Sequence, residues 1–144
     1  MRTRFWILVW VLGILFPMAF LGRLWPVFGR LFNKVFAPTW MHMLMHSFLY
    51  AVLGILLTLL LRPVTLKSYG MLFGLLLLVG ICHEAIQLVA AWTWPGWGEE
   101  LFDLGVDLIG GGMGVGLGSV ILAIANARSS RPRKAQLPSS SSRP

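Results

Sequence analysis

Long stretches without a charged residue constrain the fold of this chain more than any other feature. No Asp, Glu, Lys or Arg occurs between Val35 and Leu61, and further apolar stretches precede and follow this one. A helix needs roughly 20 mainly apolar residues to cross a bilayer. Only 12% of the residues are charged, whereas a soluble domain has about 25%. The sequence therefore predicts an integral membrane protein.

The apolar stretches predict an all-α membrane protein, a bundle of four transmembrane helices, because a backbone in lipid must satisfy its own hydrogen bonds. The expected spans are approximately Phe5–Leu21, Met41–Leu61, Gly70–Trp92 and Leu104–Ala125. Pro17 predicts a kink in the first span. This span follows Arg2 and Arg4 but has no small-x-small cleavage site after it, which favours a membrane anchor over a signal peptide.

The segment between the first two spans has the pattern of an amphipathic helix. Its basic face holds Arg23, Arg30 and Lys34, and its apolar face holds Trp25, Phe28, Leu31, Phe32, Val35 and Phe36. Pro26 is tolerated in the first turn of such a helix. A helix of this kind lies in the membrane interface. We expect it to act as a spacer there, and a lid over a site between the spans is the alternative.

The basic residues predict that both termini lie inside the cell. This arrangement leaves three of them outside, namely Arg23, Arg30 and Lys34. It places nine of them inside, namely Arg2, Arg4, Arg62, Lys67, Arg128, Arg131, Arg133, Lys134 and Arg143. Residues 1–127 then form the transmembrane domain, and 128–144 form a basic, Ser/Pro-rich cytoplasmic tail that we expect to be disordered. Because the charges mark the ends of spans, the net charge of +7 indicates membrane lipids as partners and not nucleic acid.

The polar residues of three predicted spans converge on the outer half of the bilayer. The second span begins with His42 and His46, the third ends with His83, Glu84 and Gln87, and the fourth begins with Asp103 and Asp107. His42, His46 and Tyr50 follow one helical stripe. The candidate ligand-binding residues are therefore His46, Tyr50, Glu84, Gln87, Asp103 and Asp107. Interhelical contacts alone are the simpler explanation for any single one of them.

The carboxylates and glycines of the fourth span share one face. A carboxylate at the centre of a membrane helix costs about 2.5–3.5 kcal/mol, so we expect Glu84 to be protonated or paired with His46, His83 or an amide. Gly110, Gly114 and Gly118 lie on the face of Asp107 and predict close helix packing. The opposite face carries Gly105, Gly112 and Gly116, which allows a second contact or a homodimer. Asp103 is also a candidate helix N-cap, and Glu99 and Glu100 are expected to be solvated loop charges.

Three runs of the sequence together resemble the VanZ-like family. They are HSFLYAVLGILL from His46, HEAIQL from His83 and DLGVDLIGGGMG from Asp103, and the similarity covers roughly residues 40 to 118. The family often has an Asp-Lys pair before the histidine, an arginine before the first aspartate and an asparagine in the second aspartate position. This chain has His42 and Met43, a Trp/Gly/Glu stretch and Asp107 there. If the basic residues of the family hold an anionic ligand, this protein binds a different ligand or binds it differently.

The resemblance implies a multi-pass protein of the bacterial cell membrane, in a family associated with teicoplanin resistance and without an established biochemical activity. We expect a non-enzymatic protein without cofactor, whose outward-facing polar pocket binds an envelope lipid or lipophilic ligand. One alternative is an intramembrane metal-dependent hydrolase with His42 and His46 as ligands, although His83-Glu84 does not continue into an HExxH motif. Another is a small proton-coupled transporter subunit that acts as a dimer and uses Glu84.

Overall fold

The computed structural model describes residues 2–16, 21, 24–36, 38–91 and 96–130. Regular structure within these ranges is helical, and no strand occurs in them. The helices are α1 (Arg2–Leu15), α3 (Pro26–Phe36), α4 (Thr39–Leu61), α5 (Leu66–Ala91) and α6 (Trp97–Ser129). The predicted all-α class is confirmed. The predicted kink at Pro17, the basic residue Arg23, and the tail from residue 131 lie outside the described residues.

Three of these helices, α4, α5 and α6, are long and apolar enough to cross a membrane. Two of them lie within a few residues of the predicted spans Met41–Leu61 and Gly70–Trp92. The helix that overlaps the first predicted span, α1, has 14 residues, fewer than the roughly 20 that a span requires. Because that predicted span continues to Leu21, beyond the end of α1, a fourth transmembrane helix stays a prediction.

The last helix is longer at both ends than the predicted span Leu104–Ala125. It begins at Trp97, so Glu99 and Glu100 lie in its first turn and not in a loop. Gly96 occupies the N-cap position, and Asp103 therefore lies inside the helix and does not cap it. Acidic side chains are favourable in the first turn because they interact with the positive end of the helix dipole. The C-terminal end of α6 reaches Ser129, two residues beyond the predicted domain boundary at 127.

A short turn makes α4 and α5 antiparallel. Arg62 ends α4 in the left-handed conformation, and its N–H donates to the Thr58 carbonyl over 2.8 Å. Thr65 and Ser68 then form a reciprocal cap at the start of α5, in which each backbone N–H donates to the other side-chain oxygen. Such a cap satisfies amide donors that a helix start leaves without partners.

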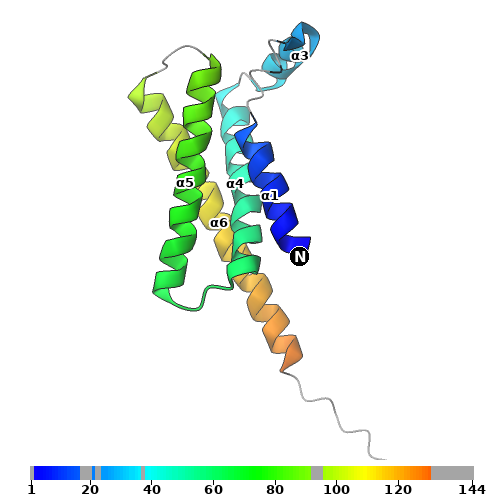
Figure 1. Ribbon diagram of the computed structural model, residues 1–144, viewed down its shortest axis with the longest axis vertical. Helices are drawn as coiled ribbons and strands as arrows, with labels where there is room; N and C mark the ends of the chain where they lie inside the picture. Colours follow the sequence, from blue (N-terminus) through cyan, green and yellow to red (C-terminus); the bar gives the residue numbers. More distant parts are fainter. Residues whose placement is uncertain (1, 17–20, 22–23, 37, 92–95, 131–144) are drawn as a thin grey trace, which may run out of the picture.

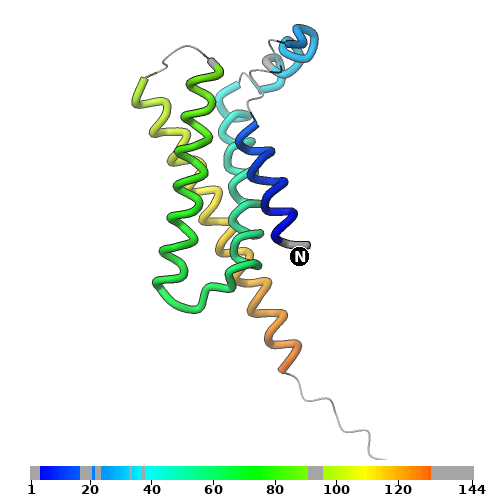
Figure 2. Tube along the Cα trace, in the orientation of Figure 1, coloured from blue at the N-terminus to red at the C-terminus, as the bar shows by residue number. Residues whose placement is uncertain are grey.

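The glycines of α6 lie directly against the backbone of α4 (Figure 1). A Cβ atom at Gly110 would meet the backbone of Ser47, one at Gly114 would meet Ala51, and one at Gly118 would meet Thr58 and Ile55. Both helices run in the same direction (Figure 2). The residue numbers in contact therefore differ by a nearly constant amount along the two helices. Residues without side chains allow this approach, and the α4–α6 pair forms the centre of the bundle.

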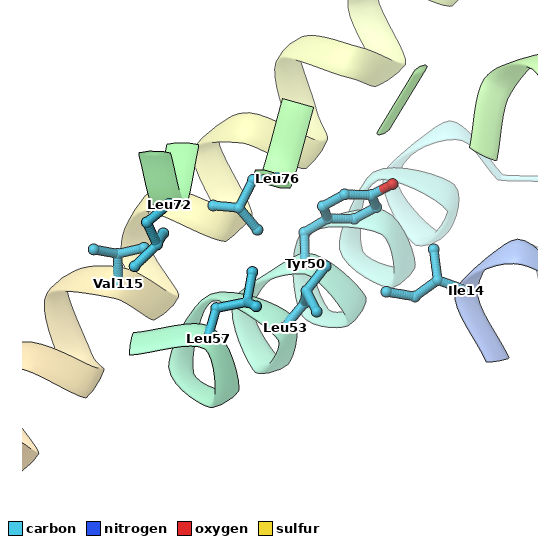
Figure 3. Packing of buried hydrophobic residues seen from close by; sticks show 7 residues of the cluster. All are labelled: Ile14, Tyr50, Leu53, Leu57, Leu72, Leu76 and Val115. Atoms are coloured by element: carbon cyan, nitrogen blue, oxygen red, sulfur yellow. The ribbon is translucent and has the colours of Figure 1, made fainter. Parts of the chain in front are cut away.

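An apolar cluster fills the space between α1, α4, α5 and α6. Its buried members are Ile14, Tyr50, Leu53, Leu57, Leu72, Leu76 and Val115 (Figure 3). The indole N–H of Trp10 donates to the Leu49 carbonyl over 2.9 Å and attaches α1 to α4. Tyr50 closes one side of the cluster, with its hydroxyl directed away from the leucines (Figure 3).

The short helix α3 lies beyond the end of the bundle at which α4 begins (Figure 1). It starts at Pro26, so Pro26 lies in its first turn as predicted, whereas Trp25 of the predicted apolar face precedes the helix. Val27 and Leu31 are more than half exposed, although both are apolar. The helix thus presents an uncovered apolar surface next to basic Arg30 and Lys34, and its position in a membrane interface stays a prediction.

Candidate functional site

The helices α4 and α6 begin, and α5 ends, at the same end of the bundle, which we name the polar end. The N-terminal turns of α4 and α6 and the C-terminal turns of α5 meet there (Figure 1). Each of these helices brings polar side chains to this end. The following contacts show that these side chains form one connected group.

Two histidine–aspartate pairs join α4 to α6, one helical turn apart. The outer pair is His42 Nε2–H donating to Asp103 Oδ2 over 3.1 Å, with side chains that are 33% and 20% exposed. In the inner pair, His46 Nδ1–H donates to Asp107 Oδ1 over 2.9 Å, and both side chains are almost completely buried. Residues four apart on parallel helices meet in the same register, so the two pairs form a ladder into the bundle.

The third helix, α5, adds His83 and Glu84 beside the inner pair. Glu84 Oε1 lies 4.0 Å from His46 Nδ1, and the rings of His46 and His83 stack with centroids 5.1 Å apart. Both α5 side chains are buried. Among the described residues, histidines are the basic side chains that lie within 4.0 Å of these carboxylates. A buried carboxylate is costly without a compensating charge or hydrogen bonds, so this composition needs an explanation.

Tyr50 and Gln87 lie on either side of His83. The Tyr50 ring stacks on His83 with centroids 6.2 Å apart, and its hydroxyl is buried without a hydrogen-bond partner. The Gln87 amide lies 2.9 Å from His83 Nε2, with its nitrogen as donor to the ring. Gln87 therefore holds the Nε2 edge of the His83 ring. The Nδ1 edge is left without a hydrogen-bond partner.

An open pocket of about 600 Å³ lies above the outer pair. It is lined by Phe36, Thr39, His42, Gly98, Glu99, Phe102 and Asp103. His42 and Asp103 therefore belong both to the pocket wall and to the ladder. The inner group of His46, His83, Glu84 and Asp107 lies one turn deeper.

The structure brings the predicted site residues into one region but changes their grouping. His46, Glu84 and Asp107 lie together at its centre with His83, and a ligand atom of each lies within 4.8 Å of the others. His42, predicted with His46 as a metal-ligand pair, pairs instead with Asp103 at the entrance. Sequence reasoning omitted His83 from the candidate ligands, although its position next to Glu84 and four residues before Gln87 pointed to it.

A comparison of the chain with protein-family models, with curated proteins and with solved structures finds no match. The functional argument accordingly rests on the contacts of the polar end.

Proposed function

We propose that this chain is a VanZ-like protein of the bacterial cell membrane that spans the bilayer several times. Three helices of sufficient length and apolar character support this proposal. The surplus of basic residues at both termini and in the turn after α4 supports an inside location for these segments. The polar end then faces outward, with Phe5–Leu21 as the remaining span.

The polar end binds the head group of a lipid or another lipophilic molecule in this proposal. The observation that carries it is the continuity between the open pocket and the ladder, since His42 and Asp103 belong to both. A polar head group finds donors and acceptors along this path, while the apolar surface of the helices is available to acyl chains. Phe36 at the end of α3 lines the pocket, which supports α3 as a cover in the interface.

The resemblance to the VanZ-like family is consistent with this site. The three sequence runs that carry the resemblance supply His46, Glu84 and Asp107, and these side chains lie together. Sequence runs that are distant from one another converge on one group, as expected for a shared site. The ligand is expected to differ from that of other members because His42 and Met43 replace their Asp-Lys pair.

Native mass spectrometry on protein released gently from its own membrane tests this proposal. We expect a co-purified lipid whose occupancy falls at least tenfold in the Asp103→Asn and His42→Ala variants. The matched control is Ser119→Ala, which alters a polar residue of α6 away from the pocket. Equal lipid occupancy in all four proteins would contradict the proposed pocket.

A metal-dependent hydrolase is the second candidate function, because four buried potential ligands lie behind the pocket. Histidine and carboxylate ligands can hold a metal ion that activates water. The ligands would be His46, His83, Glu84 and Asp107 of the inner group. His46 is thus retained from the predicted pair, and His42 is not a ligand. Hydrolysis of a lipid ester by purified protein, abolished in Glu84→Gln, would favour this candidate over binding alone.

A further inference from the structure

The inner group has the composition and compactness of a metal centre. His46 comes from α4, His83 and Glu84 come from α5, and Asp107 comes from α6. One ligand atom of each lies within 4.8 Å of all the others, and all four side chains are buried. Tetrahedral ligand atoms at about 2.0–2.1 Å from a zinc ion lie roughly 3.3 Å apart. Small side-chain movements would therefore close the group around an ion.

Unsatisfied atoms support the same conclusion independently. His46 Nε2, His83 Nδ1, Glu84 Oε1 and Asp107 Oδ2 are each buried without a hydrogen-bond partner. Buried polar atoms are nearly always hydrogen-bonded, and those that are not indicate a missing water or ion or a functional role. Every member of the group contributes one such atom. This pattern is not expected of side chains that serve only to hold helices together.

Charge balance favours a divalent cation. Glu84 and Asp107 together bring two negative charges into buried positions between α4, α5 and α6. Two neutral imidazoles, two carboxylates and one doubly charged cation have no net charge, which removes most of the cost of burying the carboxylates. Two further carboxylates of α6 lie near Glu84. Asp103 has its own partner in His42, and the Oε2 of Glu100 is buried without a hydrogen-bond partner.

The Gln87 amide can supply the supporting hydrogen bond of a metal-bound His83 after a half-turn about its last bond. Metal-bound histidines usually donate their second ring N–H to an oxygen acceptor, which fixes the tautomer. The Gln87 amide contacts His83 Nε2, and a half-turn of this amide exchanges its nitrogen for its oxygen. His83 Nε2–H then donates to Gln87, and the Nδ1 lone pair faces the other ligands.

We propose that His46, His83, Glu84 and Asp107 bind one divalent transition-metal ion, with zinc as the ion to be tested first. Imidazole nitrogen selects this class over calcium and magnesium, which prefer oxygen ligands. The site is distinct from the head-group pocket, which begins one helical turn closer to the end of the bundle. It does not depend on lipid binding or on hydrolysis.

Metal loading of the full-length chain, purified in detergent without a histidine tag, tests the site. The protein is stripped with a chelator, dialysed against Zn²⁺ or Co²⁺, and analysed for bound metal by elemental mass spectrometry. We expect one metal ion per chain and a visible Co²⁺ spectrum of low coordination number. Zinc binding should raise the thermal unfolding temperature, because an ion that binds only the folded state stabilises it.

Four variants test the site: two replace proposed ligands, one replaces the supporting residue Gln87, and one is a control. His83→Ala and Asp107→Asn should each weaken zinc binding more than tenfold, and Gln87→Leu should weaken it by about 10–100-fold. His42→Ala is the matched control, because it removes a histidine from the same end of the bundle and should keep the full metal content. Circular dichroism of each variant verifies that it is folded.

Two results would overturn the proposal. One is a folded wild-type chain that binds less than a tenth of an equivalent of zinc or cobalt. The other is a loss of metal in His42→Ala with retention in His83→Ala, which would place the ion on the α4 histidine pair. Lipid occupancy measured on the same samples separates the outcomes, because failure of the metal site leaves lipid binding by the pocket unchanged.

Discussion

The α4–α6 interface consists of two stretches that are held together differently. Near the polar end, side chains connect the helices through the pairs His42–Asp103 and His46–Asp107. Further along, the backbones themselves meet, with Gly110 against Ser47 and Gly114 against Ala51. Polar side chains join the helices in the first stretch, and close approach of the two backbones joins them in the second.

The two stretches have the same register, that is, nearly the same offset in residue number between α4 and α6. Both histidine–aspartate pairs join residues 61 positions apart, and the glycine contacts continue at nearly the same offset. Close packing of backbones tolerates little sliding, so the glycines fix the register in which the polar side chains meet. The glycine stretch thus positions the candidate site without touching it.

A large side chain in the glycine stretch should lower the free energy of unfolding more than the other substitutions below. Gly114→Leu places a side chain where a Cβ atom already meets the backbone of Ala51. Overpacking costs about 1–3 kcal/mol, and more where the neighbour is backbone that cannot move aside. Unfolding in detergent followed by circular dichroism measures this loss, together with loss of zinc binding. Gly116→Leu is the matched control, since a Cβ atom at Gly116 meets nothing within 4 Å. Equal stability of the two variants would refute the role assigned to the glycines.

Breaking the inner pair should have the next largest effect. A double-mutant cycle with His46→Ala and Asp107→Asn, measured in metal-free protein, should give a coupling free energy of about 0.6–1.7 kcal/mol. The reason is that both side chains are buried and bond directly over 2.9 Å. Additive effects of the two substitutions on the free energy of unfolding would show that the pair does not couple.

Breaking the outer pair should matter less for stability. His42 and Asp103 are 33% and 20% exposed, and exposed ion pairs contribute about 0–1 kcal/mol. The same cycle with His42→Ala and Asp103→Asn should therefore give a smaller coupling free energy than the inner cycle. A larger coupling free energy at the outer pair than at the inner pair would contradict this prediction.

Substitution on the opposite face of α6 should have the smallest effect on the folded chain. A Cβ atom at Gly105 meets nothing within 4 Å, so Gly105→Ala should change the free energy of unfolding by less than about 1 kcal/mol. The oligomeric state of the wild type and of Gly105→Leu, measured by light scattering, tests the homodimer that Gly105, Gly112 and Gly116 would allow. A dimeric wild type that becomes monomeric in Gly105→Leu would assign this face to a second copy.

Features that depend on one helix at a time could be predicted from the sequence. The apolar stretches predicted α4 and α5 to within a few residues, because hydrophobic length alone determines them. The start of α6 was wrong, since Glu99, Glu100 and Asp103 resemble loop charges unless the helix dipole is considered. The position of Asp103 opposite His42 depends on the register of two helices, which no single stretch of sequence contains.

Membership of the inner group illustrates the same limit. Glu84 and Asp107 were candidates because a carboxylate in an apolar span requires a reason. His83 was not among the candidate ligands, since a histidine next to a glutamate on a helix points about 100° away from it. Only the packing of α5 against both α4 and α6 turns both side chains toward His46.

The order of α4, α5 and α6 along the chain also determines the order in which the polar end is assembled. The chain has to pass through α5 before α6 can pair with α4, so the glycine face and Asp107 are synthesised last. Until α6 emerges from the ribosome and inserts, His46, His83 and Glu84 are present without their final partner. A chain that stops before α6 would therefore leave His46, His83 and Glu84 without the carboxylate of Asp107.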